Sequence, residues 1–241
     1  MSQFAVQGDG RLRCPDSAAF AALLQPRAAA PQAAAAAPEP LLGGARFASV
    51  LDGVLCPAEC AAHIAETERR GYVAALLNRG GGAEAYHPDV RSNFRCIVDS
   101  PEFADTLFER VAHALPAGFA LGARVVGFNE RLRFLRYDPG ETFKPHRDGV
   151  FERTEGPLAG QFTLVTALLY LNEGYEGCFT TFYSDDGIKD RVGPAGVAVA
   201  PRPGRLLLHD HNLLHRAPPL AAGRKYVLRT DVLFERAAGG R

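Results

Sequence analysis

Residues 162–172 read FTLVTALLYLN, a β-prone run that is followed by the turn residues EGYEG (173–177). The same alternation of β-prone runs and turn residues extends to both sides of it after about residue 120. The other runs are RLRFLRY (131–137), CFTTFYS (178–184), GVAVAP (196–201), RLLLH (205–209) and KYVLRTDVLF (225–234). No helix-length periodic segment separates these runs, so we expect an antiparallel sandwich or barrel rather than a parallel α/β sheet.

Two helices are predicted before these strands. The segment PAECAAHIAETERRG (57–71) has a proline in its first turn and Gly71 at its end, which is how helices commonly start and stop. In SPEFADTLFERVAHALP (100–116), Ser100 can cap the helix, and Phe103, Leu107 and Val111 recur on one face. Both helices need a partner surface, so the sequence predicts an α+β fold with N-terminal helices packed on a β-sandwich.

The first forty residues have a different composition. Residues 17–40 are mostly alanine and proline, which offers little bulk for a core. We interpret residues 1–40 as a flexible leader and residues 41–241 as one domain, with a helical part (41–120) and a β-core (121–236). The leader contains a few arginines, so a weak organellar targeting role stays open.

Composition excludes several classes of protein. The chain has 241 residues with 27 Lys+Arg and 27 Asp+Glu, and this balance argues against a protein that coats nucleic acid. It has no apolar run long enough for a membrane span and no secretory signal pattern, so we expect an intracellular, cytoplasmic protein. Five cysteines without a CxxC pair favour reduced thiols.

The most informative short motif is HRD at residues 146–148. Side chains alternate along an extended segment, so His146 and Asp148 point the same way and could hold one cation between them. His215, just beyond a β-prone run, is the best candidate for a third ligand. Two imidazoles and one carboxylate on one face of a metal are typical of non-haem Fe(II) oxygenases. Taken alone, the tripeptide is more typical of an ordinary surface strand with polar residues, so the rest of the chain has to support a metal site.

A pair of cations follows His215. Lys225 and Arg229 are four residues apart on a predicted strand, so both can face one side as a buried clamp. Buried cations need an anionic partner, and a dicarboxylic cosubstrate would supply one. The alternative is a strand with exposed Lys and Arg.

Four spaced blocks resemble the prolyl 4-hydroxylase-like group of the 2-oxoglutarate- and Fe(II)-dependent dioxygenases. The segment VRSNFRCIVDSPEFADTLFERV resembles the helical region before the core, and NERLRFLRYDPGETFKPHRDG resembles the strand that carries the HxD pair. TLVTALLYLNEGYEGCFTTF resembles the YLN and T.F segment, and GRLLLHDHNLLHRAPPLAAGRKYVLRTDVLF resembles the segment with the distal His and the cationic strand.

The resemblance implies a double-stranded β-helix, or jelly roll, with Fe(II) held by His146, Asp148 and His215. It also implies that 2-oxoglutarate binds the metal and that Lys225 or Arg229 holds its 5-carboxylate, with Tyr137 touching the same carboxylate; the choice between the two cations stays open. Dioxygen would be the second cosubstrate and ascorbate the reductant. The implied reaction hydroxylates an unactivated C–H bond and releases succinate and CO2.

Peptidyl proline is the first substrate hypothesis, and a free amino acid or another small molecule is the alternative. In the family, the segment holding Arg91, Asn93 and Arg95 tends to cover the active-site mouth, so these three are substrate-binding candidates; a solvated loop is the competing interpretation. No nucleic-acid partner is expected, and the sequence does not fix the oligomeric state.

Two further points stay open at this level. Cys178 follows Gly177 where many relatives carry a second glycine, which can alter a turn near the site. His209 and His211 also precede His215 and could be mistaken for the ligand.

A zinc-dependent hydrolase and a non-catalytic jelly-roll binding module are the rival functions, since two histidines and an aspartate also suit zinc.

Overall fold

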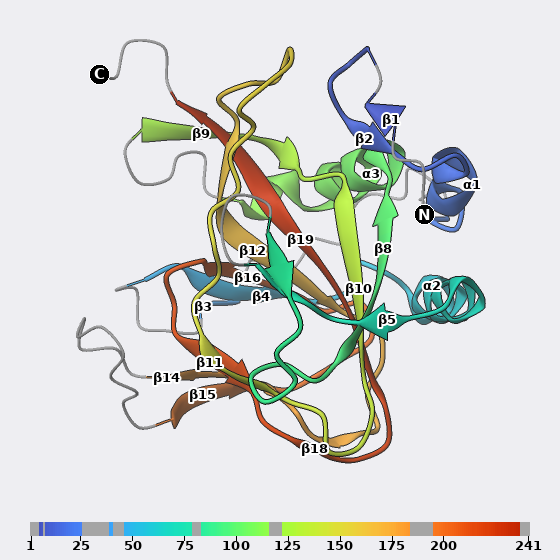
Figure 1. The fold of residues 1–241 in the computed structure, drawn as a ribbon, viewed down its shortest axis with the longest axis vertical. Coiled ribbons are helices and arrows are strands. Elements are labelled where there is room, and N and C mark those ends of the chain that lie inside the picture. Colours follow the sequence, from blue (N-terminus) through green and yellow to red (C-terminus); the bar gives the residue numbers. More distant parts are fainter. Residues whose placement is uncertain are drawn as a thin grey trace.

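A computed structural model describes residues 5–6, 8–25, 39–40, 46–78, 83–115, 122–183 and 195–236. Within these ranges the chain forms antiparallel sheets with few helices (Figure 1). The fold class predicted from the alternating runs and turns is therefore confirmed.

A nine-stranded major sheet forms around the run FTLVTALLY. This run is β12 (Phe162–Tyr170), which pairs with β16 (Leu206–Asp210) on one side and with β19 (Lys225–Arg236) on the other. The long β19 pairs with β12 along one edge and with two shorter strands along the other. The remaining strands of this sheet are β3 (Glu39–Pro40), β4 (Ala48–Leu51), β5 (Val73–Ala74), β8 (Phe94–Asp99), β9 (Ala123–Phe128) and β10 (Arg131–Tyr137).

A four-stranded minor sheet forms the second layer. Its order is β11–β17–β14–β15, with bounds Phe143–His146, His215–Ala217, Thr180–Tyr183 and Ala195–Val199. A cluster of buried apolar residues, including Tyr170 from the major sheet and Phe182 from the minor sheet, fills the space between the layers. Three two-stranded pairs complete the description: β1 (Ala5–Val6) with β2 (Leu12–Arg13), β6 (Leu77–Asn78) with β7 (Glu84–Ala85), and β13 (Glu176–Gly177) with β18 (Leu220–Ala222).

The two predicted helices form at the expected places. Helix α2 (Pro57–Arg70) ends at Gly71, whose positive φ of 87° suits glycine. Helix α3 (Pro101–Val111) starts after Ser100, whose side chain accepts a hydrogen bond from the Phe103 amide, and the 3₁₀ turn η1 (Ala112–Ala114) extends it. Both helices pack on the face of the major sheet that points away from the minor sheet (Figure 1).

The prediction that the first forty residues form a flexible leader is wrong for residues 8–25. Helix α1 (Ser17–Ala21) inserts Phe20 into the core, where the ring is 2% exposed and lies 5.3 to 5.7 Å from the rings of His63, Phe103 and Phe134. Arg13 also pairs with Glu102 of α3 at 2.7 Å. Phe20 and Leu24, four residues apart, form a short apolar face that the abundance of alanine conceals. Residues 1–4, 7 and 26–38 of the predicted leader lie outside the described residues.

Candidate functional site

The HxD motif lies between the two sheets, at the end of β11. His146 is the last residue of β11 and lies opposite His215, the first residue of β17, in the ladder of the minor sheet. Asp148 follows in a loop, where its amide donates to the His211 carbonyl at 2.9 Å. The strand pairing thus joins two parts of the chain that are about seventy residues apart.

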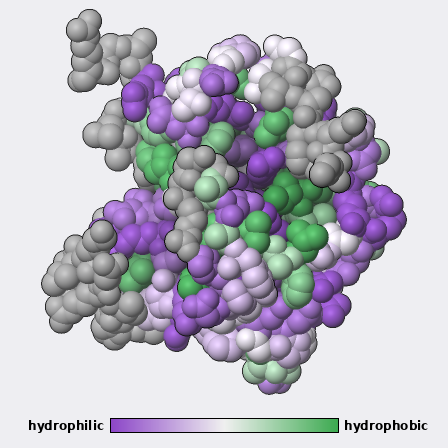
Figure 2. Space-filling model, in the orientation of Figure 1, coloured by the Kyte–Doolittle hydropathy of each residue, from purple (hydrophilic) through white to green (hydrophobic). Residues whose placement is uncertain are grey.

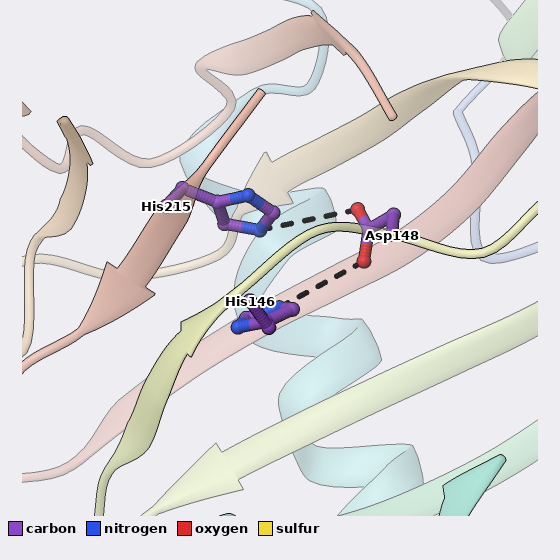
Figure 3. Close-up of side chains that lie close together, drawn as sticks. All are labelled: His146, Asp148 and His215. Carbon is purple, nitrogen blue, oxygen red and sulfur yellow. Dashed lines mark ion pairs between the residues drawn. The ribbon is translucent and has the colours of Figure 1, made fainter. Parts of the chain in front are cut away.

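The three predicted ligand residues converge. His146 Nε2 lies 3.8 Å from Asp148 Oδ1, and His215 Nε2 lies 3.9 Å from Asp148 Oδ2 (Figure 3). One donor atom from each residue lies within 4.8 Å of the others. An ion bound 2.0–2.2 Å from each donor requires separations of about 3 to 4 Å, so these residues fit a single metal ion.

Backbone carbonyls orient both imidazoles for this task. Nδ1 of His146 lies 2.8 Å from the Lys144 carbonyl, and Nδ1 of His215 lies 2.9 Å from the Leu213 carbonyl. A carbonyl only accepts, so Nδ1 carries the proton and the Nε2 lone pair faces Asp148. Burial lowers the pKa of both histidines, and for His146 the neighbouring His215 adds to this. Neutral imidazole is the form that binds a metal.

Asp148 is held by several neighbours. The Thr166 hydroxyl donates to its Oδ2 at 2.5 Å, and Arg229 Nη2 lies 3.4 Å from its Oδ1. Burial raises the pKa of Asp148, but the Arg229 guanidinium and the surrounding histidines outweigh burial and hold the pKa well below its usual range. The carboxylate is therefore ionised and ready to bind a cation.

His209 and His211, the alternative distal histidines, lie in different places. His209 Nε2 lies 4.0 Å from Asp148 Oδ2, with its ring 4.6 Å from that of His215, so it adjoins the cluster. His211 faces Asp231 instead, with its Nε2 3.3 Å from Oδ1. The geometry thus favours His215 as the third ligand.

A pocket that is open to solvent adjoins the three residues. Its inner end contains Lys225, which is 1% exposed and donates from Nζ to the Cys178 carbonyl at 2.6 Å. The rings of Tyr137 and Tyr170 lie 5.0 and 5.9 Å from Nζ. Burial lowers the pKa of Lys225, and no carboxylate among the described residues forms an ion pair with it.

Lys225 and Arg229 differ in their partners. Arg229 Nη2 is shared between Asp148 at 3.4 Å and Asp231 at 3.0 Å, and these carboxylates raise the pKa of Arg229 although burial lowers it. Both cations line the pocket. Only Lys225 lacks a carboxylate partner in the described part of the chain, which makes it the more available of the two for an anion.

Cys178 has an unusual backbone conformation at this end of the pocket. Cys178 has a φ of 55°, an unusual value for a residue other than glycine. This conformation directs its carbonyl to Lys225 Nζ. Cys178 therefore helps to fix the ammonium group.

The three substrate-binding candidates have separate positions. Arg91 lines the pocket, with its guanidinium 4.7 Å from the Phe143 ring. Asn93 is fully buried and accepts a hydrogen bond from Arg91 Nε at 2.7 Å, so it orients Arg91 and has no exposed surface. Arg95 pairs with Glu84 of β7 and does not line the pocket.

Two polar residues of the pocket, Thr180 and Arg216, were not predicted from the sequence. The Thr180 hydroxyl accepts a hydrogen bond from Tyr170 at 2.8 Å. Arg216 directly follows His215 and could have been suspected from that position. Nothing in its sequence context distinguishes Thr180 from the many threonines that strands contain.

The chain is similar to known oxygenases. Residues 132–230 match the family model of the 2OG-Fe(II) oxygenase superfamily. The "Probable prolyl 4-hydroxylase 6" of Arabidopsis thaliana is 31% identical over 114 residues, which are 40% of this chain and 39% of that protein. The matched part thus spans well under half of that relative.

Solved structures share the fold. A prolyl-4-hydroxylase of Pseudomonas putida superposes with a TM-score of 0.55 at 22% identity, over 78% of this chain and 93% of that one. A prolyl hydroxylase of Trichoplax adhaerens, in complex with a hypoxia inducible factor peptide fragment, gives a TM-score of 0.55 at 17% identity, over 78% and 84% of the two chains. In the described ranges, no helix is long and apolar enough to cross a membrane.

Proposed function

We propose that the chain is a dioxygenase of the 2OG-Fe(II) oxygenase superfamily, whose family model matches residues 132–230, and that it uses Fe(II), 2-oxoglutarate and dioxygen to hydroxylate an unactivated C–H bond. The observation that carries this proposal is the convergence of His146, Asp148 and His215 beside a pocket with a buried, uncompensated lysine. Fe(II) bound by two histidines and one carboxylate keeps open positions at which dioxygen is activated.

The chain's own contribution begins with fixing the ligands. The Lys144 and Leu213 carbonyls hold the two imidazoles in one tautomer, and Thr166 holds the Asp148 carboxylate. Such outer contacts orient metal ligands and strengthen binding. The three side chains approach from one side, which leaves the pocket side free for the cosubstrate and the substrate.

We assign the 5-carboxylate of 2-oxoglutarate to Lys225. Its ammonium lies at the closed end of the pocket without a carboxylate partner, whereas Arg229 already pairs with Asp148 and Asp231. Tyr137 packs its ring against the ammonium, so it would flank the bound carboxylate. The buried charge would then be neutralised on cosubstrate binding.

Apolar side chains separate the lysine from the mouth of the pocket. Leu135, Leu168 and Val227 line this middle part. They would pack against the methylene groups of 2-oxoglutarate and keep water away from the reacting centre.

For the substrate, we propose a prolyl residue in a protein or peptide. The support is the similarity to the Arabidopsis protein named "Probable prolyl 4-hydroxylase 6" and the resemblance of the four sequence blocks to the prolyl 4-hydroxylase-like group. A free amino acid or another small molecule is the alternative, and the reductant would be ascorbate.

The zinc-hydrolase interpretation has less support. A hydrolase needs a general base beside the metal-bound water. Asp148 is the only carboxylate among the described residues that line the pocket, and it belongs to the ligand set. No second carboxylate is therefore available there as the base.

The test is product formation by the purified full chain with Fe(II), 2-oxoglutarate, ascorbate and air. A pool of proline-containing peptides is added, and succinate, CO2 and the peptide masses are measured. We expect equal amounts of succinate and CO2 and a gain of one oxygen on proline, all lost in His146→Ala and Asp148→Ala. Succinate formation that persists in both variants would refute the assignment. Oxidation of free amino acids but no peptide would favour the small-molecule alternative.

A further inference from the structure

The pocket carries far more positive than negative charge. Its charged lining residues are Arg91, Arg216, Lys225 and Arg229 against the single carboxylate of Asp148. Ferrous iron (+2) and 2-oxoglutarate (−2) cancel each other. The loaded pocket therefore keeps its excess of cations, and low-dielectric walls strengthen their field.

Arg91 is the clearest unused cation in this lining. Its Nε donates to Asn93 at 2.7 Å, and its guanidinium lies over the Phe143 ring. None of the ion pairs of the described residues includes Arg91, and within the same ranges its two terminal nitrogens make no hydrogen bond. Burial lowers the pKa of Arg91 to about 10, so the group remains charged at neutral pH. The Arg91 guanidinium therefore lines the pocket, is oriented by Asn93 and has no ion-pair partner among the described residues.

The positive charge continues beyond the pocket along the major sheet. We call Arg91, Arg95, Arg131, Arg133 and Arg229 the arginine row; it crosses β8, β10 and β19 and their adjoining loop. Among the described residues, three carboxylates outside the ligand set pair with members of the row: Glu84, Asp99 and Asp231. They reach Arg95, Arg131, Arg133 and Arg229, whereas Arg91 has no ion-pair partner within the described ranges.

Part of this row works against the stability of the sheet. Arg133 and Arg229 are direct partners across β10 and β19, a register at which like charges repel. One carboxylate, Asp231, serves both, at 3.4 Å from Arg133 and 3.0 Å from Arg229. Repulsion between neighbouring side chains beside a functional site is typical of residues that serve function rather than stability.

The two ends of the site-facing surface are unlike each other. Lys225 and Tyr137 form the closed end, whereas the side chains of Arg133 and Arg229 remain 24% and 20% exposed at the other. Arg133 and Arg229 are therefore accessible to a polypeptide that lies over this end of the site, whereas Lys225 is not. Figure 2 shows hydrophilic and hydrophobic residues interleaved over the middle of the drawn face rather than one broad hydrophobic patch.

Building on the proposed oxygenase function, we propose that the substrate is an acidic polypeptide segment, in which Asp or Glu residues flank the hydroxylated residue and bind Arg91 and the arginine row. Neighbouring strands lie about 4.8 Å apart, so a row across three strands suits several carboxylates better than one. The carboxylates between the arginines would repel a continuous phosphate backbone, and the chain has no net positive charge to attract a nucleic acid.

The test is peptide binding without turnover. Three fluorescent twelve-residue peptides with the same central proline are compared, one flanked by Glu and Asp, one by Gln and Asn and one by Lys. Fluorescence anisotropy is measured with the full chain, Fe(II) and 2-oxoglutarate in the absence of oxygen. We expect the acidic peptide to bind at least tenfold more tightly than the neutral one, and raised salt to reduce this difference.

Variants locate the binding surface. Arg91→Gln and Arg133→Gln should each weaken acidic-peptide binding about tenfold and leave neutral-peptide binding unchanged, while Arg69→Gln on the exposed face of α2 serves as the matched control. Far-ultraviolet circular dichroism and the thermal midpoint check that the variants fold. Equal affinity for acidic and neutral peptides, or no effect of either variant, would overturn the proposal, as would tighter binding of a single-stranded oligonucleotide.

This measurement is separable from the oxygenase assignment. If acidic peptides bind but no succinate forms under air, the catalytic proposal fails and the binding surface stands. If neutral peptides or amino acids are hydroxylated and acidic peptides do not bind, the oxygenase stands and the acidic-substrate proposal fails.

Discussion

Replacing Lys225 by methionine should separate cosubstrate binding from folding. Lys225 is 1% exposed, and its ammonium donates a hydrogen bond to the Cys178 carbonyl. Methionine has similar length and no charge, so it removes a buried cation that lacks an anionic partner. Such replacements are often neutral or stabilising, so we expect the thermal midpoint of Lys225→Met to be unchanged or higher.

The same change should strongly weaken 2-oxoglutarate binding. A hydrogen bond to a charged group contributes about 1.5–3 kcal/mol, which corresponds to a loss of roughly 10- to 150-fold in affinity. Calorimetric titration with 2-oxoglutarate, in the presence of Fe(II) and without oxygen, measures this directly. The affinity for the metal alone should stay unchanged, since Lys225 does not contact the three ligand residues.

Arg229→Met is the matched comparison. Arg229 contacts Asp148 and Asp231, so its loss should alter metal affinity and affect 2-oxoglutarate less than the loss of Lys225 does. The reasoning is refuted if Lys225→Met binds 2-oxoglutarate as tightly as the unmodified chain while Arg229→Met does not bind it.

Three other predictions concern the core, the acid range and the ligand shell. Phe20→Ala should cost about 3–5 kcal/mol of unfolding free energy in urea titrations, and a loss below about 1 kcal/mol would mean that α1 does not contribute to the core. Burial raises the pKa of Glu59, but Arg110 and backbone amides outweigh it and lower the pKa to about 2; because a depressed carboxyl pKa stabilises the fold above the unfolded value, stability should fall as pH drops from about 4.5 towards 2. Glu59→Gln should flatten that acid dependence, and an unchanged pH profile would contradict the ion pair. Thr166→Val should reduce Fe(II) affinity about tenfold by freeing the Asp148 carboxylate, with Thr181→Val as the control, and equal losses in the two variants would argue against a specific role.

The fold was largely predictable because its signals are local. Turn residues between β-prone runs predicted the antiparallel strands, and the positions of Ser100 and Gly71 predicted where two helices start and end. The α1 segment was misjudged because only Phe20 and its few apolar neighbours distinguish it from a disordered alanine-rich tract. Burial depends on what the rest of the chain provides, and composition cannot show that.

The candidate site was predictable only in part for a related reason. Alternation along one strand put His146 and Asp148 on one side, but the contact with His215 depends on the β11–β17 pairing. Lys225 and Arg229 differ in their partners because Arg229 pairs with Asp231 and Lys225 donates to the Cys178 carbonyl. Neither partner can be recognised from the sequence. Side-chain competition of this kind appears only in three dimensions.

The central claim is that His146, Asp148 and His215 form one metal site at which 2-oxoglutarate also binds. The most direct measurement is the calorimetric affinity of the full chain for 2-oxoglutarate, with and without Fe(II) and in the absence of oxygen, for the unmodified chain and for Asp148→Ala. We predict that tight binding requires Fe(II) and is lost in Asp148→Ala, although the variant remains folded by circular dichroism. Binding that is equally tight without the metal, or unchanged in Asp148→Ala, would contradict the account.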